Sequence, residues 1–107
     1  MINKAQVDLH SVNITEEKLV EFLNVIARGY RTEVQYHNDL HGADVAQMVF
    51  MFNKMGNLKE RCELSDMDLI AMLVAAACHD YDHDGLTNPY HVNSMTFRAI
   101  RYHDESV

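Results

Sequence analysis

The residues best suited to chemistry lie in one short stretch, residues 79–85, whose order is His-Asp-Tyr-Asp-His-Asp-Gly. Five of these seven residues are His or Asp. An imidazole next to a carboxylate, with a second imidazole four positions on, offers the nitrogen and oxygen donors that bind divalent cations. The stretch therefore predicts a metal site.

A second pair of histidines with the same four-residue spacing lies upstream, at His37 and His41. Residues four apart lie on one face of a helix, so we expect both imidazoles to point the same way. One such pair is weak evidence, because a surface pair is more often solvated than bound to a metal. Two pairs, one of them joined to a carboxylate, strengthen the prediction.

Hydrolysis at phosphorus is the chemistry that this set of residues favours. A bound cation lowers the pKa of water from about 15.7 towards about 7, and a second cation about 3.5–4 Å away, sharing Asp80, would stabilise an in-line displacement. A remaining histidine could protonate the leaving oxygen, because an alkoxide is a poor leaving group. We therefore expect a phosphate ester or diester hydrolase.

Length and charge limit the alternatives. The chain has 107 residues, enough for one small domain, and a net charge of −7. Nucleic acids and anionic membranes attract basic surfaces, so neither is an expected partner. The longest apolar run, residues 69–78, is ten residues, short of the ~20 that span a membrane. With free thiols at Cys62 and Cys78 and no leader-like N-terminus, we expect an intracellular, cytoplasmic protein without a membrane segment.

Helices must position these residues. Capping residues and helical spacing of apolar residues predict four of them, with no strand of useful length. The four run from the Asn13–Glu16 cap to Gly29, from Asp39 to Gly56, from the Ser65 cap to near Tyr81, and from Asn88-Pro89 through Ile100. Residues 1–12 are predicted to be a flexible lead-in, and residues 57–64 a loop or short turn.

The second helix is expected to bury one apolar face. Most methionines of the chain are expected to fill the core, because the thioether side chain is flexible. The predicted face consists of Val45, Met48, Val49, Phe52 and Met55.

The two histidine clusters and their flanking residues resemble the signature of the class I 3′,5′-cyclic nucleotide phosphodiesterases. These are all-helical HD-type metal-dependent phosphohydrolases. The resemblance extends over residues 13–107, and it implies an all-α, multi-helical HD-type bundle, of which this chain would be the N-terminal third. The matching residues are Tyr36-His37-Asn38-x-x-His41 with Ala43-Asp44-Val45, and Ala76-Ala77-x-His79-Asp80-x-Asp82-His83-x-Gly85-x-x-Asn88.

The resemblance also implies a role for each matching residue. His41, His79 and Asp80 would bind a zinc ion, and Asp80 would bridge it to a second ion, magnesium or manganese. His37 would be the general acid that protonates the 3′ oxygen. Three further residues would support the site, with Asn38 behind His37, His83 holding water around the second ion, and Tyr36 lining the nucleotide pocket.

Two residues depart from the family pattern, and parts of the pattern are absent. Gly42 stands where the family usually has Ala, and Asp84 where it usually has Pro. A fourth protein ligand to zinc and the purine-binding residues would lie beyond Val107. The family function is hydrolysis of cyclic AMP or cyclic GMP to the 5′-monophosphate, with weak or no activity expected from this chain alone.

Two other hypotheses stay open. The chain could be a non-catalytic structural or interaction module derived from a phosphodiesterase, in which the rest of the domain or a protein partner covers exposed helix faces. It could also be another HD-type phosphohydrolase acting on nucleotides. The tyrosine before His37 and the Asn-x-x-His spacing favour the cyclic nucleotide branch over the latter.

Overall fold

A computed structural model describes residues 7–103 of the chain. Within this range the structure is helical and contains no strand, which confirms the predicted all-α fold class. Six helices are present where four were predicted. They are α1 (Glu16–Gly29), α2 (Asp39–Gly56), α3 (Leu58–Arg61), α4 (Asp66–Cys78), α5 (Asn88–Asn93) and α6 (Phe97–Arg101).

The three long helices begin at side-chain caps, of which those of α1 and α4 were predicted and that of α2, Asn38, was not. Thr15 caps α1 by accepting a hydrogen bond from the Lys18 N–H, and the Asn38 side chain does the same for the His41 N–H in α2. Ser65 and Asp68 form a reciprocal capping box at the start of α4. Because these side chains satisfy backbone donors at the helix ends, the starts are encoded locally and could be predicted.

The second half of the chain differs from the prediction chiefly in its last helix. The segment after α2, predicted as a loop or short turn, contains one helical turn, α3. The single helix predicted from Asn88 through Ile100 is wrong, because it ends at Asn93 and a new helix starts at Phe97. Between them Met95 adopts a left-handed φ of 46°, and Thr96 caps α6 by accepting a hydrogen bond from the Ala99 N–H.

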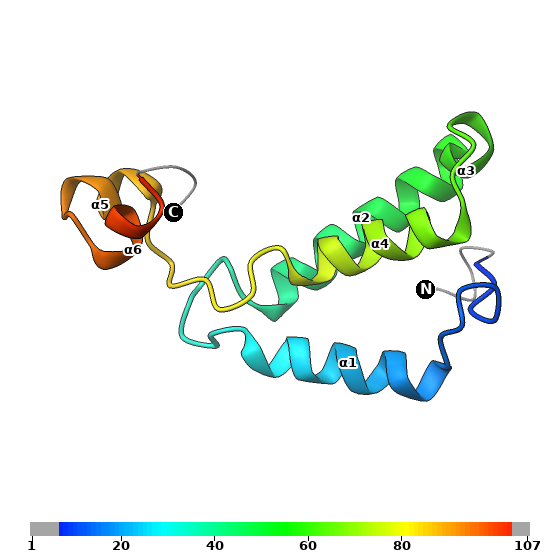
Figure 1. Cartoon of the computed structure of the whole chain (residues 1–107), viewed down its shortest axis with the longest axis horizontal. Coiled ribbons are helices and arrows are strands. Elements are labelled where there is room, and N and C mark those ends of the chain that lie inside the picture. Colours follow the sequence, from blue (N-terminus) through cyan, green and yellow to red (C-terminus); the bar gives the residue numbers. More distant parts are fainter. Residues whose placement is uncertain (1–6, 104–107) are drawn as a thin grey trace.

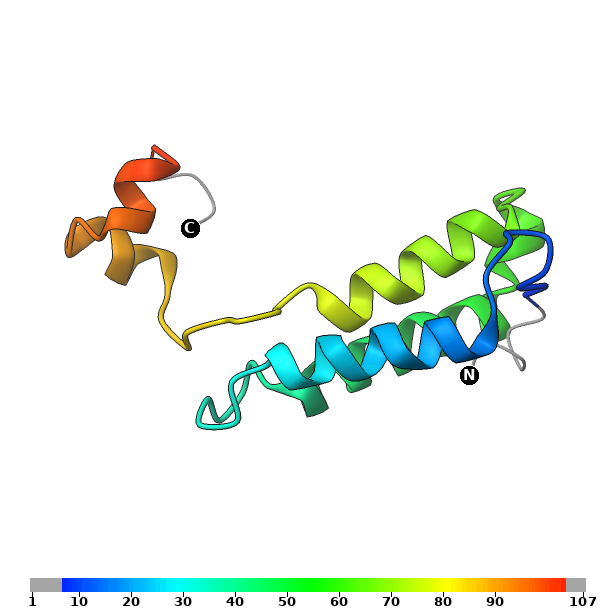
Figure 2. The ribbon, with the colours of Figure 1, turned by 60° about the horizontal axis from the view of Figure 1, so that its bottom comes forward.

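Helices α2 and α4 run antiparallel and lie side by side, with α1 along the same pair (Figures 1 and 2). The buried face of α2 consists of Gly42, Ala46, Phe50 and Asn53. The predicted face is therefore wrong in three of its five residues: Met48, Phe52 and Met55 are 54%, 61% and 79% exposed. Val45 and Val49 are half-buried, and Val49 packs against the core. Apolar residues lie on most sides of α2, so their spacing does not indicate which face is buried. The small residues Gly42 and Ala46 lie on the buried face because they let α4 approach closely.

The molecule is longer than a closed domain of its size. Its radius of gyration is 16.4 Å, against about 13 Å for a compact domain of this length. Helices α5 and α6 stand away from the other four at the end of an extended connection (Figure 1). Large apolar side chains remain exposed, including six methionines that were expected in the core: Met48, Met51, Met55, Met67, Met72 and Met95.

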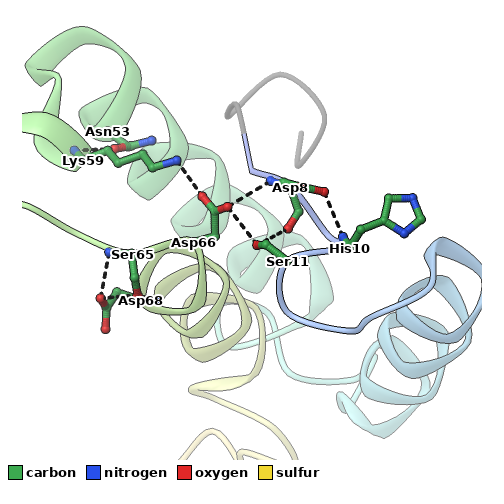
Figure 3. Close-up of polar contacts among 8 residues, drawn as sticks. All are labelled: Asp8, His10, Ser11, Asn53, Lys59, Ser65, Asp66 and Asp68. Atoms are coloured by element: carbon green, nitrogen blue, oxygen red, sulfur yellow. Dashed lines mark hydrogen bonds and ion pairs between the residues drawn. The ribbon is translucent and has the colours of Figure 1, made fainter.

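The end of the α2–α4 pair far from α5 is tied to the N-terminal segment through Asp66 (Figure 3). Asp66 Oδ1 pairs with Lys59 Nζ at 2.5 Å, and Oδ2 accepts a hydrogen bond from the Ser11 hydroxyl at 3.0 Å. Lys59 and Ser11 hold the pKa of Asp66 below its usual range. Residues 7–12 of the predicted lead-in thus contact the bundle, and residues 1–6 lie outside the described residues.

We predict that Gly42→Ala destabilises the fold. A Cβ at position 42 would lie 2.8 Å from the Tyr30 hydroxyl oxygen and 3.0 Å from the Ala77 carbonyl oxygen. This crowding should lower the free energy of unfolding by about 1–3 kcal/mol, although alanine favours a helix. Urea unfolding measures the change.

Gly56→Ala, in the last turn of the same helix, is the matched control. A Cβ there would meet only Leu58 side-chain atoms at 3.8 Å. We expect the free energy of unfolding to stay unchanged or rise by up to about 1 kcal/mol. Equal effects of the two substitutions would contradict a close approach of α2 to α4 at Gly42.

Candidate metal centre

The antiparallel pairing of α2 and α4 brings the predicted site residues to one end of the bundle. His41 lies in the first turn of α2, and His79 is the residue that follows the last turn of α4. His37 lies just before α2 and not on a helix, so the prediction that it shares a helical face with His41 is wrong. Asp80 and His83 lie in the loop after α4.

Asp80 is the residue that the histidines share. Its Oδ2 atom lies 3.1 Å from His79 Nε2, 3.3 Å from His41 Nε2 and 4.0 Å from His37 Nε2. The Asp80 side chain is only 15% exposed. Two groups of donors that could hold a cation overlap at this carboxylate, one with His41 and His79 and the other with His37 and His83.

The first group fits a zinc-like cation. His79 Nδ1 lies 2.8 Å from the Ala76 carbonyl oxygen, which can only accept, so Nδ1 carries a proton and the Nε2 lone pair of the neutral ring faces Asp80. The neutral ring thus offers Nε2 to a cation, whereas the protonated ring would donate Nε2–H to Asp80 instead. Two atoms that bind a tetrahedral zinc at about 2.0–2.1 Å lie roughly 3.3–3.5 Å apart. The separations of Asp80 from both imidazoles are close to this value.

In the second group, His83 is suited to donate a hydrogen bond rather than to bind a metal ion. Its Nδ1 accepts a hydrogen bond from the Gly85 backbone N–H at 2.9 Å, so the neutral ring carries its proton on Nε2. His83 therefore offers an N–H donor on that side and no lone pair. Its ring stacks on His37, with centroids 4.0 Å apart and an interplanar angle of 17°. This stack holds His37 beside Asp80 while leaving its side chain 34% exposed.

Tyr36 and Asn38 flank the histidines in different ways. Tyr36 is 65% exposed, and its ring centroid lies 4.8 Å from that of His37 and 4.6 Å from that of His41. Asn38 accepts a hydrogen bond from the His41 N–H at 3.1 Å and donates to the Val34 and Gln35 carbonyl oxygens at 3.2 Å each. Asn38 thus fixes both the start of α2 and the turn that carries His37.

Two residues before α2 support the site and were not predicted. The buried Tyr30 hydroxyl donates to the Ala77 carbonyl oxygen at 2.8 Å, and burial raises the pKa of Tyr30. Arg31 Nε donates to Asp82 Oδ1 at 2.8 Å, and this pairing holds the pKa of Asp82 low. Each pair joins residues about fifty positions apart, so no local pattern could reveal it.

The fold and the site together define a helical protein with a His/Asp centre suited to a metal ion. The chain belongs to the 3′5′-cyclic nucleotide phosphodiesterase family, whose sequence profile matches residues 36–107.

Individual relatives support this membership. The chain is 41% identical over 90 residues to the human dual specificity calcium/calmodulin-dependent 3′,5′-cyclic nucleotide phosphodiesterase 1B, an alignment that covers 83% of this chain and 16% of that protein. It is 36% identical over 91 residues to the 3′,5′-cyclic-nucleotide phosphodiesterase regA of Dictyostelium discoideum, covering 85% of this chain and 11% of the relative. The chain thus spans a small part of each relative.

A third relative carries the similarity over most of the chain. The high affinity cGMP-specific 3′,5′-cyclic phosphodiesterase 9A of Drosophila melanogaster is 37% identical over 98 residues, which are 92% of this chain and 6% of the relative.

Within residues 7–103, no helix has the length and apolar character needed to cross a membrane.

We predict that Asp80→Asn lowers zinc affinity at least about 10-fold, because the neutral amide removes the anionic oxygen that both donor groups share. Isothermal titration of the chain with zinc at neutral pH measures the change. Asp82→Asn is the control, since this exposed carboxylate of the same loop pairs with Arg31 and belongs to neither group. Equal zinc binding by both variants and the unaltered chain would contradict the assignment of Asp80.

Proposed function

We propose that the chain carries part of the catalytic centre of a 3′,5′-cyclic nucleotide phosphodiesterase, which hydrolyses cyclic AMP or cyclic GMP to the nucleoside 5′-monophosphate. The observation that carries this proposal is the placement of Asp80 Oδ2 within hydrogen-bond range of His79 and 3.3 Å from His41. Because the chain belongs to this family, cyclic phosphodiesters are the substrates that we expect for this centre.

Two divalent cations belong to the proposal. His41, His79 and Asp80 would hold zinc, and Asp80 would also reach a second ion, magnesium or manganese. When bound, the cations would acidify a water molecule and offset the charge of the phosphate. The net charge of −7 makes such local positive charge necessary for an anionic substrate.

The remaining residues of the site would bind, orient and transfer a proton. His37 would be the general acid for the 3′ oxygen, because its side chain is 34% exposed and only 4.0 Å from Asp80. His83 would orient water through its Nε2–H, since Gly85 engages Nδ1. Tyr36 would line the nucleotide pocket from the exposed side of the site, and Asn38 would support His37 by capping α2.

Full activity is expected only from a longer protein that contains this chain. The chain covers 16% of the human relative, and three protein donors leave positions at zinc that water or another segment must fill. The isolated chain should therefore be weakly active or inactive, and the remainder of a catalytic domain would cover its exposed helix faces. Free thiols at Cys62 and Cys78 support an intracellular, cytoplasmic location as part of this proposal.

A second function has its own supporting observation. Exposed apolar residues line the outer side of α2, among them Phe52 and Met55, and such surfaces often bind protein partners. A non-catalytic interaction module would use this surface and need no metal. Compact, monomeric behaviour of the isolated chain would remove the basis for this alternative.

We predict that two substrates with different leaving groups distinguish the role of His37 from that of the metal ligands. In a protein that includes the rest of the catalytic domain, His37→Ala should slow hydrolysis of a cyclic nucleotide by about 10²–10⁴-fold, because the departing 3′ oxygen needs a proton. A p-nitrophenyl phosphodiester has an acidic leaving group, so its hydrolysis should fall far less. Steady-state rates on both substrates provide the comparison.

His79→Ala is the matched control, because loss of a metal ligand should slow both substrates alike. If His37→Ala also slowed both to the same extent, His37 would not be the general acid. If the unaltered protein hydrolysed neither cyclic nucleotide with its metals bound, the proposed activity itself would be wrong.

A further inference from the structure

A second set of charged and polar side chains meets at Asp84, a residue of the metal-binding loop between α4 and α5. Asp84 Oδ2 is 3.1 Å from Arg98 Nη1 of α6 and 3.1 Å from His91 Nε2 of α5. The side chains of Asp84 and His91 are only 16% and 6% exposed. One carboxylate therefore joins the loop that carries Asp80 and His83 to both helices that follow it.

The other polar neighbour of His91 is Thr96. His91 Nδ1 lies 3.0 Å from Thr96 Oγ1, and that oxygen already accepts a hydrogen bond from the Ala99 N–H. In a neutral ring the Thr96 hydroxyl can donate to Nδ1, and in a protonated ring it can accept from Nδ1–H; in both states an Nε2–H faces Asp84. The contact between Nε2 and Asp84 is close and electrostatic but lacks the alignment of a hydrogen bond.

The carboxylate of Asp84 is held in its charged form. Burial on its own would raise the pKa, but a hydrogen bond from the Leu86 N–H and the contacts with His91 and Arg98 outweigh burial, and the pKa of Asp84 lies below its usual range. The charge therefore remains available to both partners at neutral pH.

The loop is also held by backbone hydrogen bonds from the Tyr81 and His83 N–H groups and by the stack of His83 on His37. It lies between the end of α4 at Cys78 and the start of α5 at Asn88, and it contains two residues with positive φ, Asp82 at 57° and Gly85 at 80°. The ion pair of Asp82 with Arg31 is exposed, since the two side chains are 57% and 38% exposed. The Arg98 side chain is itself 39% exposed, but the Asp84 carboxylate is only 16% exposed and also contacts the buried His91. Removing a partner from a largely buried carboxylate costs more than breaking an exposed ion pair. The constraint at Asp84 is thus the stronger of the two.

We propose that Asp84 is a positioning residue for the metal-binding loop: its contacts with His91 and Arg98 fix the backbone that presents Asp80 and His83. Docking of α5 and α6 and the geometry of the centre are thereby coupled. The consequence for metal affinity rests on the proposed function, while the constraint on the loop does not.

Asp84→Asn tests the proposal, because it keeps the size of the side chain and removes its charge. Asp82→Asn, which breaks the exposed pair, is the matched control. We expect Asp84→Asn to speed hydrogen exchange of the Gly85 and His83 amides in the metal-free chain, with exchange in α2 unchanged. Zinc affinity should fall about 10–100-fold, as for other partners that orient ligands, and the control should change neither quantity by more than a few-fold.

Arg98→Gln should reproduce part of the effect, because it breaks one of the two contacts of Asp84. Adding it to Asp84→Asn should change little, because that contact is already lost. Faster exchange in α2 and the loop alike would mean general destabilisation and overturn the proposal, as would unchanged exchange in the loop. If loop exchange rose selectively but the unaltered chain bound no zinc, the positioning role would stand and the metal centre would fail.

Discussion

The close approach of α2 to α4 at Gly42 decides where every candidate ligand lies. Because the helices are antiparallel, the start of α2 meets the end of α4, and this pairing sets His41 opposite His79 with Asp80 between them. The Tyr30 hydroxyl bonds the Ala77 carbonyl at the same level and closes the contact from the side of α1. A larger separation would open the donor set beyond the span of one cation.

The same packing leaves much of the chain uncovered. Of the large apolar residues of α2, Phe50 is buried, but Met48, Phe52 and Met55 face outward. Helices α5 and α6 extend from the bundle, with Phe97 and Ile100 exposed. An extended shape with apolar faces is costly for an isolated chain in water. It suits a segment that packs against further chain or a partner, which agrees with the small part of each relative that the alignments cover.

Local signals were sufficient for part of this structure. The starts of α1, α2 and α4 follow from caps whose side chains accept hydrogen bonds from backbone N–H groups three residues on, so the sequence carries the whole interaction. The grouping of the site residues was predicted from two spaced clusters and a family resemblance, and the structure places them together. Their chemical roles remain predictions.

Other features depend on contacts that sequence spacing does not contain. The buried face of α2 was predicted wrongly, because its apolar residues surround the helix and only the fit to α4 selects Gly42 and Ala46. The break between α5 and α6 depends on a positive φ at Met95, a residue type that rarely adopts it. The proton position on His83 depends on where the Gly85 N–H points.

X-ray absorption spectroscopy at the zinc edge tests the central claim most directly, because it identifies the atoms that bind the metal. The zinc-loaded chain should show imidazole nitrogens, two per zinc, and oxygen at about 2.0–2.1 Å, with no sulfur. A zinc–sulfur distance of about 2.3 Å, or a spectrum without imidazole scattering, would place the metal elsewhere and contradict the assignment of His41, His79 and Asp80.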